Sequence, residues 1–332
     1  MALYGNPDMC LKRDFRVTRA TAQSLMRLIA SPQDHGWGQD MEVLVFLYSL
    51  AHGLSLSVVS RAFGIPKSTV HDMIHRVSRE IKGKLAILIS LPSPEDLPDV
   101  AQGFMDLSRS PAFDHVAGAM DGCHIRIRAP GNLHQADYFN YKLFPSIQMQ
   151  AVCDAKGRFL DIFVGYPGSV HDARVLRNSP IFHQALYPPA GYYLLGDGAY
   201  PCLETPIGIL TPYKHPLRGR IQEEYNVCHA RARSVVERAF GMMKARWRAT
   251  LSKALEVSPA FAPDIIACCA FLHNLCLSMN DDLEDIEMPE PDPQIAPPIR
   301  GPERSGNHTR DRIALMNAVG HLPQHLHDHN YW

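Results

Sequence analysis

The chain has 332 residues, 46% of them hydrophobic and 20% charged, and it carries a net charge of −1. This length is sufficient for two domains with buried cores, and the composition is that of an ordinary globular protein. No apolar run reaches about 18 residues, which excludes a membrane-spanning helix, and the eight cysteines contain no C-x-x-C pair, which argues against a zinc site or a disulfide scaffold.

Charge is unevenly distributed along the chain. Residues 203–253 contain ten Lys or Arg against four Glu, whereas residues 281–292 contain seven acids and no base. A basic segment supplies the attraction that a phosphate backbone requires. Basic helices are more often simply solvated surfaces, so the charge pattern alone leaves both interpretations open.

Residues 1–105 are predicted to be helical. Residues 41–52 are apolar over a helical length, and two further helices are predicted in residues 55–81 around a Gly-Ile-Pro break. Ser57 and Ser68 precede the apolar positions of these two helices, so we expect them to be the N-caps.

Two helices around a short Gly-containing turn are typical of a helix-turn-helix, here at about residues 55–81. In such a unit the second helix enters the major groove of duplex DNA. The alternative is an ordinary helical hairpin that packs against the rest of the protein, and the pattern does not separate the two. The side chains that the second helix would present to DNA are those of Lys67, Ser68, Thr69, His71 and His75.

Residues 106–280 alternate strand and helix patterns. The predicted strands are 116–127, 145–153, 159–164, 192–195 and 209–212, and the predicted helices are 170–186, 229–248 and 265–277. Three antiparallel strands, a helix, a strand and further helices follow the order of the ribonuclease H-like fold. The predicted fold class is therefore α/β, with this core preceded by an all-α helix-turn-helix region.

The C-terminal segment, residues 281–332, mixes acids with closely spaced prolines and is predicted to be a linker or disordered tail. Within it, residues 311–319 are amphipathic, and we expect them to fold back on the protein or to bind a partner. The terminal histidines, which could bind a transition metal, are more simply explained as part of a mobile tail. These histidines are His321, His325, His327 and His329.

Three acids stand where a catalytic metal site could form. Cleavage of a phosphodiester is served by two metal ions, and Mg²⁺ and Mn²⁺ prefer carboxylate oxygens. Asp121 lies inside an apolar strand, where an unpaired carboxylate is costly, and Asp197 lies between glycines at the end of another strand. Glu237 shares a helix face with Arg233 and Lys244. The alternatives are that the aspartates are hydrogen-bonded turn residues and that Glu237 pairs with Arg233.

Four ordered segments carry a family resemblance. They are MDGCHIRI (120–127), PGSVHDARVL (167–176), LGDGAYP (195–201) and SVVERAFGMMKARWR (234–248). They resemble the PIF/Harbinger DDE transposases, including the domesticated Harbinger transposase-derived nuclease, and the resemblance runs from about residue 41 to about residue 280. It implies a DDE catalytic domain over residues 106–280.

The resemblance also implies roles for individual residues. The family's two catalytic aspartates fall on Asp121 and Asp197, and its glutamate falls on Glu237. Asp172, in an H-D pair, becomes an additional candidate ligand for the two Mg²⁺ or Mn²⁺ ions, although an acid at a helix start can also simply satisfy free backbone N–H groups. Cys123 and Ala199 depart from the residues common in the family, and neither would be a ligand.

The function predicted on these grounds is a metal-dependent endonuclease or transposase. It would cut phosphodiester bonds at transposon ends and join the freed 3′-hydroxyl to target DNA. The alternative is a domesticated nuclease, or a non-catalytic DNA-binding protein that retains the fold. The side chains expected to contact phosphates are those of Arg233, Arg238, Lys244, Arg246 and Arg248.

The expected partners are double-stranded DNA, further copies of the chain and a Myb/SANT-like DNA-binding protein, which the family resemblance implies. The N-terminus lacks the apolar segment of a secretory signal, and no compact Lys/Arg cluster typical of a nuclear import signal is visible. We therefore expect a nuclear protein whose import depends on its partner, with a cytoplasmic fraction and no association with membranes.

Overall fold

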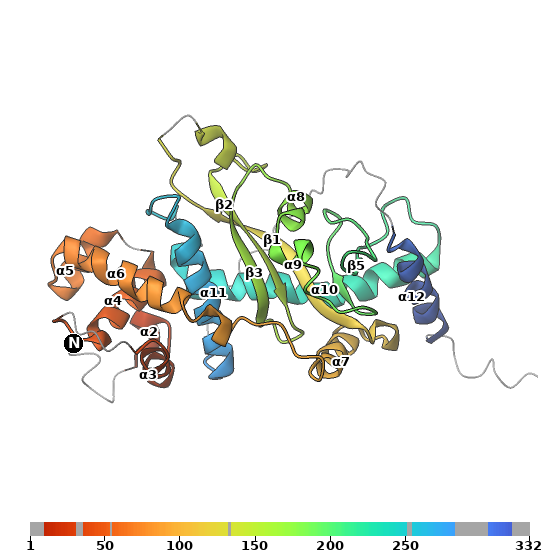
Figure 1. Cartoon of the computed structure of the whole chain (residues 1–332), viewed down its shortest axis with the longest axis horizontal. Coiled ribbons are helices and arrows are strands. Elements are labelled where there is room, and N and C mark those ends of the chain that lie inside the picture. Colours follow the sequence, from red (N-terminus) through yellow and green to blue (C-terminus); the bar gives the residue numbers. More distant parts are fainter. Residues whose placement is uncertain are drawn as a thin grey trace, which may run out of the picture.

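The computed structural model describes residues 10–30, 36–53, 55–131, 134–250, 254–282 and 305–320. The molecule is elongated, with the N-terminal helices at one end, the sheet in the middle and the last helix at the other end (Figure 1). The long helix α10 (Arg220–Arg246) runs along the sheet and joins the middle to the far end. Among the described helices, none is long and apolar enough to cross a membrane.

The N-terminal region is helical, as predicted. Its helices are α2 (Lys12–Phe15), α3 (Arg19–Leu28), α4 (Gln39–His52), α5 (Leu56–Phe63), α6 (Lys67–Lys82) and α7 (Leu97–Ser108). The turn between α5 and α6 begins at Gly64, whose φ of 67° is the left-handed conformation that glycine adopts without strain. Two helices around a three-residue turn are thus present, and their role in binding DNA stays a prediction.

The predicted caps of these two helices are wrong. The N-cap of α5 is Ser55, and that of α6 is Pro66, so Ser57 and Ser68 lie inside the helices. Proline has a fixed φ and no N–H, and at φ −54° and ψ 141° Pro66 ends the turn and lets the helix begin at Lys67.

The centre of the molecule is a five-stranded mixed sheet of order β3-β2-β1-β4-β5. The strands are β1 (Val116–Arg126), β2 (Ser146–Cys153), β3 (Phe159–Pro167), β4 (Tyr193–Leu195) and β5 (Ile209–Leu210). The first three are antiparallel neighbours, whereas β4 pairs parallel with both β1 and β5. This order confirms the mixed α/β class and is consistent with a ribonuclease H-like core.

Two predicted helices have different bounds in the structure. Instead of one helix over residues 170–186, there are two short ones, α8 (Asp172–Arg177) and α9 (Pro180–His183). The break precedes Pro180, because a proline cannot continue the hydrogen-bond ladder of a preceding helix and starts a new one instead. Conversely, α10 begins at Arg220, well before the predicted residue 229.

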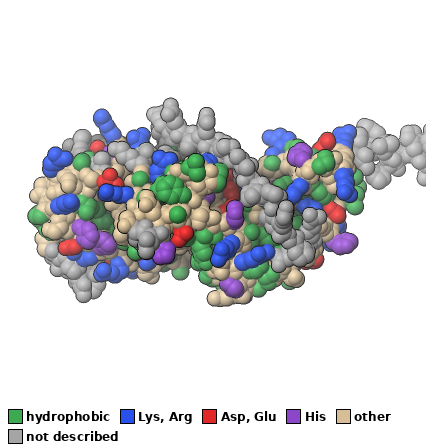
Figure 2. All heavy atoms as spheres, turned by 90° about the horizontal axis from the view of Figure 1, so that it is seen from above, with side chains coloured by type: hydrophobic (Ala, Val, Ile, Leu, Met, Phe, Trp, Pro, Cys, Tyr) green, Lys and Arg blue, Asp and Glu red, His purple; other side chains and the backbone are tan. Residues whose placement is uncertain are grey.

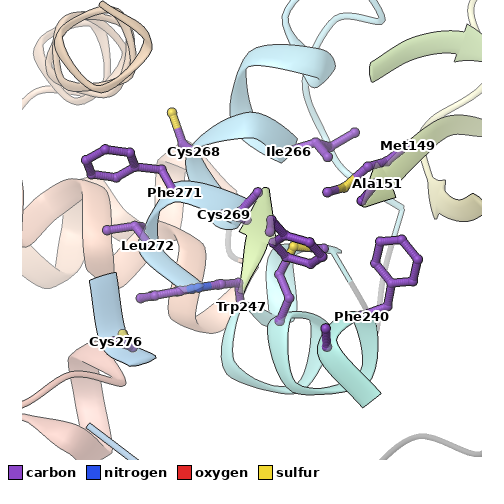
Figure 3. Packing of buried hydrophobic residues seen from close by; sticks show 14 of the residues in the cluster. Met149, Ala151, Phe240, Trp247, Ile266, Cys268, Cys269, Phe271, Leu272 and Cys276 are labelled. Atoms are coloured by element: carbon purple, nitrogen blue, oxygen red, sulfur yellow. The ribbon is translucent and has the colours of Figure 1, made fainter. Parts of the chain in front are cut away.

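The core lies between α10, α11 (Ala262–Ser278) and the sheet. The apolar stripe of α10, formed by Val236, Phe240 and Met243 at helical spacing, is buried, and α11 contacts α6 as well as β3. Seven of the eight cysteines are buried and all are free thiols. Figure 3 shows Phe240 and Trp247 of α10 packed with Cys269 and Leu272 of α11, next to Met149 of β2. Because this cluster continues into the N-terminal helices, α11 connects them to the sheet.

Part of the predicted tail belongs to the folded body. Helix α12 (Asn307–Gly320) folds back and packs on α10, burying Ile313 and Ala314. Asp281 is buried and accepts hydrogen bonds from the Thr18 amide and the Thr21 hydroxyl, both at 2.6 Å. Residues 283–304 and 321–332, which include the four histidines, lie outside the described residues.

Candidate active site

The sheet topology brings two acids together from separate segments. Ala119 of β1 pairs with Leu195 of β4 in a parallel register. Asp121 and Asp197 each follow two residues later, so they lie side by side where β4 ends. Asp121 Oδ1 accepts the Gly122 amide at 2.8 Å, and Asp197 Oδ1 accepts the Ala199 amide at 2.9 Å. Both residues are buried.

Helix α10 contributes the third acid together with a cation. Nη1 of Arg233 donates to Asp121 Oδ2 at 3.1 Å, and Nη2 donates to Glu237 Oε1 at 2.5 Å. Arg233 is 9% exposed. The predicted alternative, an ion pair between Arg233 and Glu237, is therefore present, and the same guanidinium joins Glu237 to Asp121.

Asp172 approaches the site from α8 across the neighbouring backbone of β1. Its carboxylate accepts a hydrogen bond from the Gln148 amide of β2. A Cβ at Gly122 would overlap Asp172 Oδ1, so only glycine leaves space for the carboxylate at this position. The side chain is thus directed to the sheet.

Burial and repulsion between the carboxylates disfavour the charged form of these acids. Burial raises the pKa of Asp121 well above its usual range, the charge of Asp197 raises it further, and Arg233 lowers it. Burial, followed by the charge of Asp197, raises the pKa of Asp172 to about 7. Burial also raises the pKa of Asp197. Such mutual perturbation is typical of functional sites, although structural clusters also produce it.

These residues suit a divalent metal by chemistry and charge. The carboxylates of Asp121, Asp197 and Glu237 surround one buried guanidinium, and Asp172 lies close to Asp197, which leaves negative charge that Mg²⁺ or Mn²⁺ would balance through oxygen ligands. As arranged, no three Asp, Glu, His or Cys side chains of the described residues surround a point at which a metal could bind. Arg233 lies between Asp121 and Glu237, so a metal shared by those two acids would take the place of its guanidinium.

The structure corrects two of the predicted phosphate contacts. Arg233 and Arg246 are both buried, Arg233 among the acids and Arg246 against backbone oxygens of Arg16 and Asp281. Neither presents its guanidinium to a ligand at the surface. Arg238 and Arg248 are exposed, and half-buried Lys244 donates to the carbonyl oxygen of His124 at 3.1 Å.

The predicted DNA-contacting residues of α6 occupy its first three turns. Lys67, Ser68 and His71 are exposed, Thr69 is half-buried, and the ring of His75 stacks on Phe261 with centroids 3.7 Å apart. These residues lie at the N-terminal end of the molecule, away from the acids in the sheet. Figure 2 shows acidic side chains recessed near the middle of one face, with Lys and Arg side chains on either side.

Sequence reasoning missed two supporting residues, Gln148 and Gly122. Gln148 pairs with His124 in the β1–β2 register, and its side chain lies on the face that Asp172 covers. The only signal in the sequence was a glycine directly after Asp121, in a strand interior where glycine often marks the close approach of another group.

Comparison with known proteins agrees with this arrangement. Residues 120–274 match the family model of the DDE superfamily endonuclease. The chain is 29% identical over 258 residues to "Protein ALP1-like" of Arabidopsis thaliana, covering 73% of this chain and 62% of that protein, so it spans about three fifths of that relative's length. It is 28% identical over 297 residues to "Putative nuclease HARBI1" of Homo sapiens, covering 88% and 81%. No solved structure matches. The resemblance to the Harbinger family is confirmed.

Proposed function

We propose that this chain, which carries a DDE superfamily endonuclease domain over residues 120–274, hydrolyses phosphodiester bonds of duplex DNA with two divalent metal ions. The observation that carries the proposal is the convergence of Asp121, Asp197 and Glu237 from β1, the loop after β4 and α10. Buried acids that raise one another's pKa are expensive for a fold to maintain unless a cation is bound there in the working protein.

In this proposal Asp121, Asp197 and Glu237 hold Mg²⁺ or Mn²⁺, and Asp172 is a further ligand that Gln148 orients. The ions, when bound, activate water and stabilise charge on the attacking and leaving oxygens. Arg233 serves as the counter-ion of Asp121 and Glu237 before metal binds, which keeps two like charges in place in the buried site.

The bond changes are those of simple hydrolysis. A water oxygen bonds to phosphorus, the bond to the 3′ oxygen breaks, and the proton lost by the water is balanced by one gained at the 3′-hydroxyl. The products are a 3′-hydroxyl and a 5′-phosphate. In a transposase, this 3′-hydroxyl would then attack a phosphodiester of target DNA. Exposed Arg238 and Arg248 and half-buried Lys244 would contact the phosphates, adding affinity that depends on salt rather than on base sequence.

The test is a nicking assay with the purified full chain and duplex DNA, with Mg²⁺, with Mn²⁺ and with a chelator. We expect cleavage with either metal and a loss of more than about 100-fold in Asp197→Asn, since a ligand is removed. Asp106→Asn, an exposed acid of α7, is the matched control. Cleavage by Asp197→Asn at the wild-type rate would refute the assignment.

A second function is favoured by the ion pairs of Arg233. Because this arginine already neutralises part of the acid cluster, the chain could bind DNA without turnover and retain the acids as a structural network. In that case Mg²⁺ would not increase nicking in any variant, and DNA binding would be indifferent to the chelator.

The remaining partners rest on the family resemblance alone. We propose that duplex DNA is bound by more than one copy of the chain, and that a Myb/SANT-like protein contributes sequence recognition and nuclear import. Co-purification of the two proteins and the mass of the complex in solution would test this.

A further inference from the structure

The connection between β1 and β2 projects beyond the sheet (Figure 1). We call residues 139–144 the hairpin tip. The amide of Asn140 donates to the Phe144 carbonyl at 3.1 Å, and the Leu143 amide donates to the Asn140 carbonyl at 2.9 Å. The side chain of Asn140, which is 3% exposed, accepts from the amides of Lys142 and Phe144 at 3.0 and 3.3 Å. A buried asparagine therefore fixes the shape of the turn.

This rigid turn presents apolar side chains to solvent. Leu143 is 81% exposed, more than any other large hydrophobic residue in the described part of the chain, and Tyr141 is 54% exposed. Leu143 also has a φ of 60°, a left-handed conformation that is costly for a bulky side chain and persists only where the surroundings impose it. The combination of high exposure and a strained backbone makes Leu143 a candidate for contact with a partner.

Two cations lie beside the aromatic rings of the hairpin tip. The guanidinium of Arg126 lies 4.3 Å from the centre of the Phe144 ring, and Nζ of Lys142 lies 5.6 Å from that of Tyr141. Arg128 is exposed in the same connection. The nearby exposed acid, Asp137, has its carboxylate 3.4 Å from His134 Nδ1. A nucleic acid carries negative phosphates and apolar base faces, so it matches apolar side chains next to cations. An apolar protein surface would match the apolar side chains only.

The hairpin tip is joined rigidly to the acid cluster. The ring of Tyr141 lies 5.9 Å from that of His124, which follows Asp121 by three residues on β1 and is therefore roughly 10 Å further along the strand. Because side chains alternate along a strand, His124 and Tyr141 lie on the face of the sheet that Gly122 and Asp172 share, opposite the side chain of Asp121. The Ser169 amide donates to the Asp137 carbonyl at 3.1 Å. This hydrogen bond attaches the segment that leads from β3 to Asp172 to the connection between β1 and β2. The spacing corresponds to a few stacked bases.

We propose that the hairpin tip is a wedge that inserts Leu143 between the bases of duplex DNA next to the cleaved phosphate and stacks the displaced base on Tyr141. The wedge rests on the proposed nuclease function, and it specifies that the duplex is unstacked next to the phosphate that is cut. Apolar wedges of this kind unstack a base step, and a base stacked on an aromatic ring contributes affinity without sequence choice.

The test uses the full chain with Ca²⁺, which permits binding studies without rapid turnover, and short duplexes that carry 2-aminopurine at successive positions. We expect a position at which the wild-type chain increases 2-aminopurine fluorescence, and we expect Leu143→Ala and Tyr141→Ala to abolish the increase. Each should weaken binding between about 5-fold and about 150-fold. Leu315→Ala, a leucine of α12 that is 55% exposed, is the matched control.

Salt dependence separates a wedge from a phosphate contact. Leu143→Ala should lower affinity equally at all salt concentrations, whereas Arg128→Ala should reduce the slope of affinity against salt. Leu143→Asn, which tolerates a positive φ, should fold like the wild type and still lose the fluorescence signal. Unchanged fluorescence and affinity in all hairpin-tip variants would overturn the wedge, and if the wild type still cleaved DNA the nuclease assignment would stand. A wild-type chain that binds no duplex would overturn both.

Discussion

Arg233 and Arg246 lie on the same helix, α10, and are almost equally buried, at 9% and 8% exposed, yet their surroundings differ in kind. Arg246 donates to the carbonyl oxygens of Arg16 and Asp281, and its charge lies 3.6 Å from the Asp281 carboxylate. Arg233 donates to Asp121 and Glu237, in a cluster that holds more acids than cations.

The pKa shifts of the acids express the same difference. Although burial raises the pKa of Asp281, hydrogen bonds from Thr18 and Thr21 and the charge of Arg246 lower it below its usual value. Burial and Asp197 raise the pKa of Asp121, and Arg233 offsets this only in part. An acid whose charge is satisfied within the fold stabilises the fold, whereas a buried acid whose charge is only partly balanced is a candidate ligand for a cation.

The largest expected effect comes from removing each arginine in turn. Arg233→Gln leaves Asp121 and Glu237 without their shared counter-ion, so it should lower the free energy of unfolding by about 3–5 kcal/mol in the absence of metal. Arg246→Gln should lower it by less, because Asp281 keeps its ion pair with Lys12 at 3.5 Å and its hydrogen bonds from Thr18 and Thr21. Mg²⁺ should restore most of this loss in Arg233→Gln and none in Arg246→Gln. Urea unfolding with Mg²⁺ and with a chelator measures this change in the free energy of unfolding. An equal effect of Mg²⁺ on the two variants would show that the surroundings of Arg233 and Arg246 do not differ in metal binding.

Asp121→Asn should separate activity from stability. We expect nicking to fall by more than about 100-fold, because a metal ligand is lost. The melting temperature without metal should stay the same or rise, because the substitution removes a carboxylate that Asp197 repels. Thermal unfolding and the nicking assay together test this. A variant that melts well below the wild type would show that Asp121 is a structural acid like Asp281.

Asp281→Ala should behave in the opposite way. Loss of the hydrogen bonds from Thr18 and Thr21 should lower the free energy of unfolding by about 2–4 kcal/mol. Nicking measured well below the melting temperature should be unchanged. The exposed neighbour Asp282 offers a matched control, since Asp282→Ala should change stability by less than about 0.5 kcal/mol.

The smallest effect concerns pH. The pKa of Asp172 is raised to about 7, above that of an unfolded aspartate, so its contribution to the stability of the metal-free protein is fully present below the unfolded pKa and is lost as pH rises through about 7. Between about pH 5 and about pH 7, Asp172→Asn should flatten the decline of stability by at most about 1.4 kcal/mol per pH unit. A pH profile identical to that of the wild type would contradict the shift.

Much of the fold could be predicted because its determinants are local. Strands β1 and β2 and helix α11 follow from the spacing of apolar residues within each segment. The errors arose where a single residue overrides the pattern, as Pro180 does in dividing the expected helix into α8 and α9. The start of α10 at Arg220 was missed although Ile221, Tyr225 and Cys228 recur at helical spacing in its first turns.

The candidate site could be predicted only in part. Asp121, Asp197 and Glu237 stand in recognisable local motifs, so they could be named without a structure. Their adjacency depends on the parallel pairing of β1 with β4, which no local pattern specifies. Gln148 was missed because its role depends on the Asp172 carboxylate that faces it, and the hairpin tip was missed because its role depends on the exposure of Leu143. Neither property can be read from the residue type.

By itself, the sequence determined the order of the elements, the identity of the acids and the apolar stripe of α10 that the core buries, because each depends on residues close together in the chain. Tertiary structure alone decided that two arginines predicted to bind phosphate are interior, and that one of them is a counter-ion of the acid cluster. Arg246 meets Arg16 from the opposite end of the chain, and Arg233 meets Asp121 across the sheet. The surroundings of a charge in a folded protein are set by packing between distant segments, and those surroundings determine whether it binds a ligand or stabilises the fold.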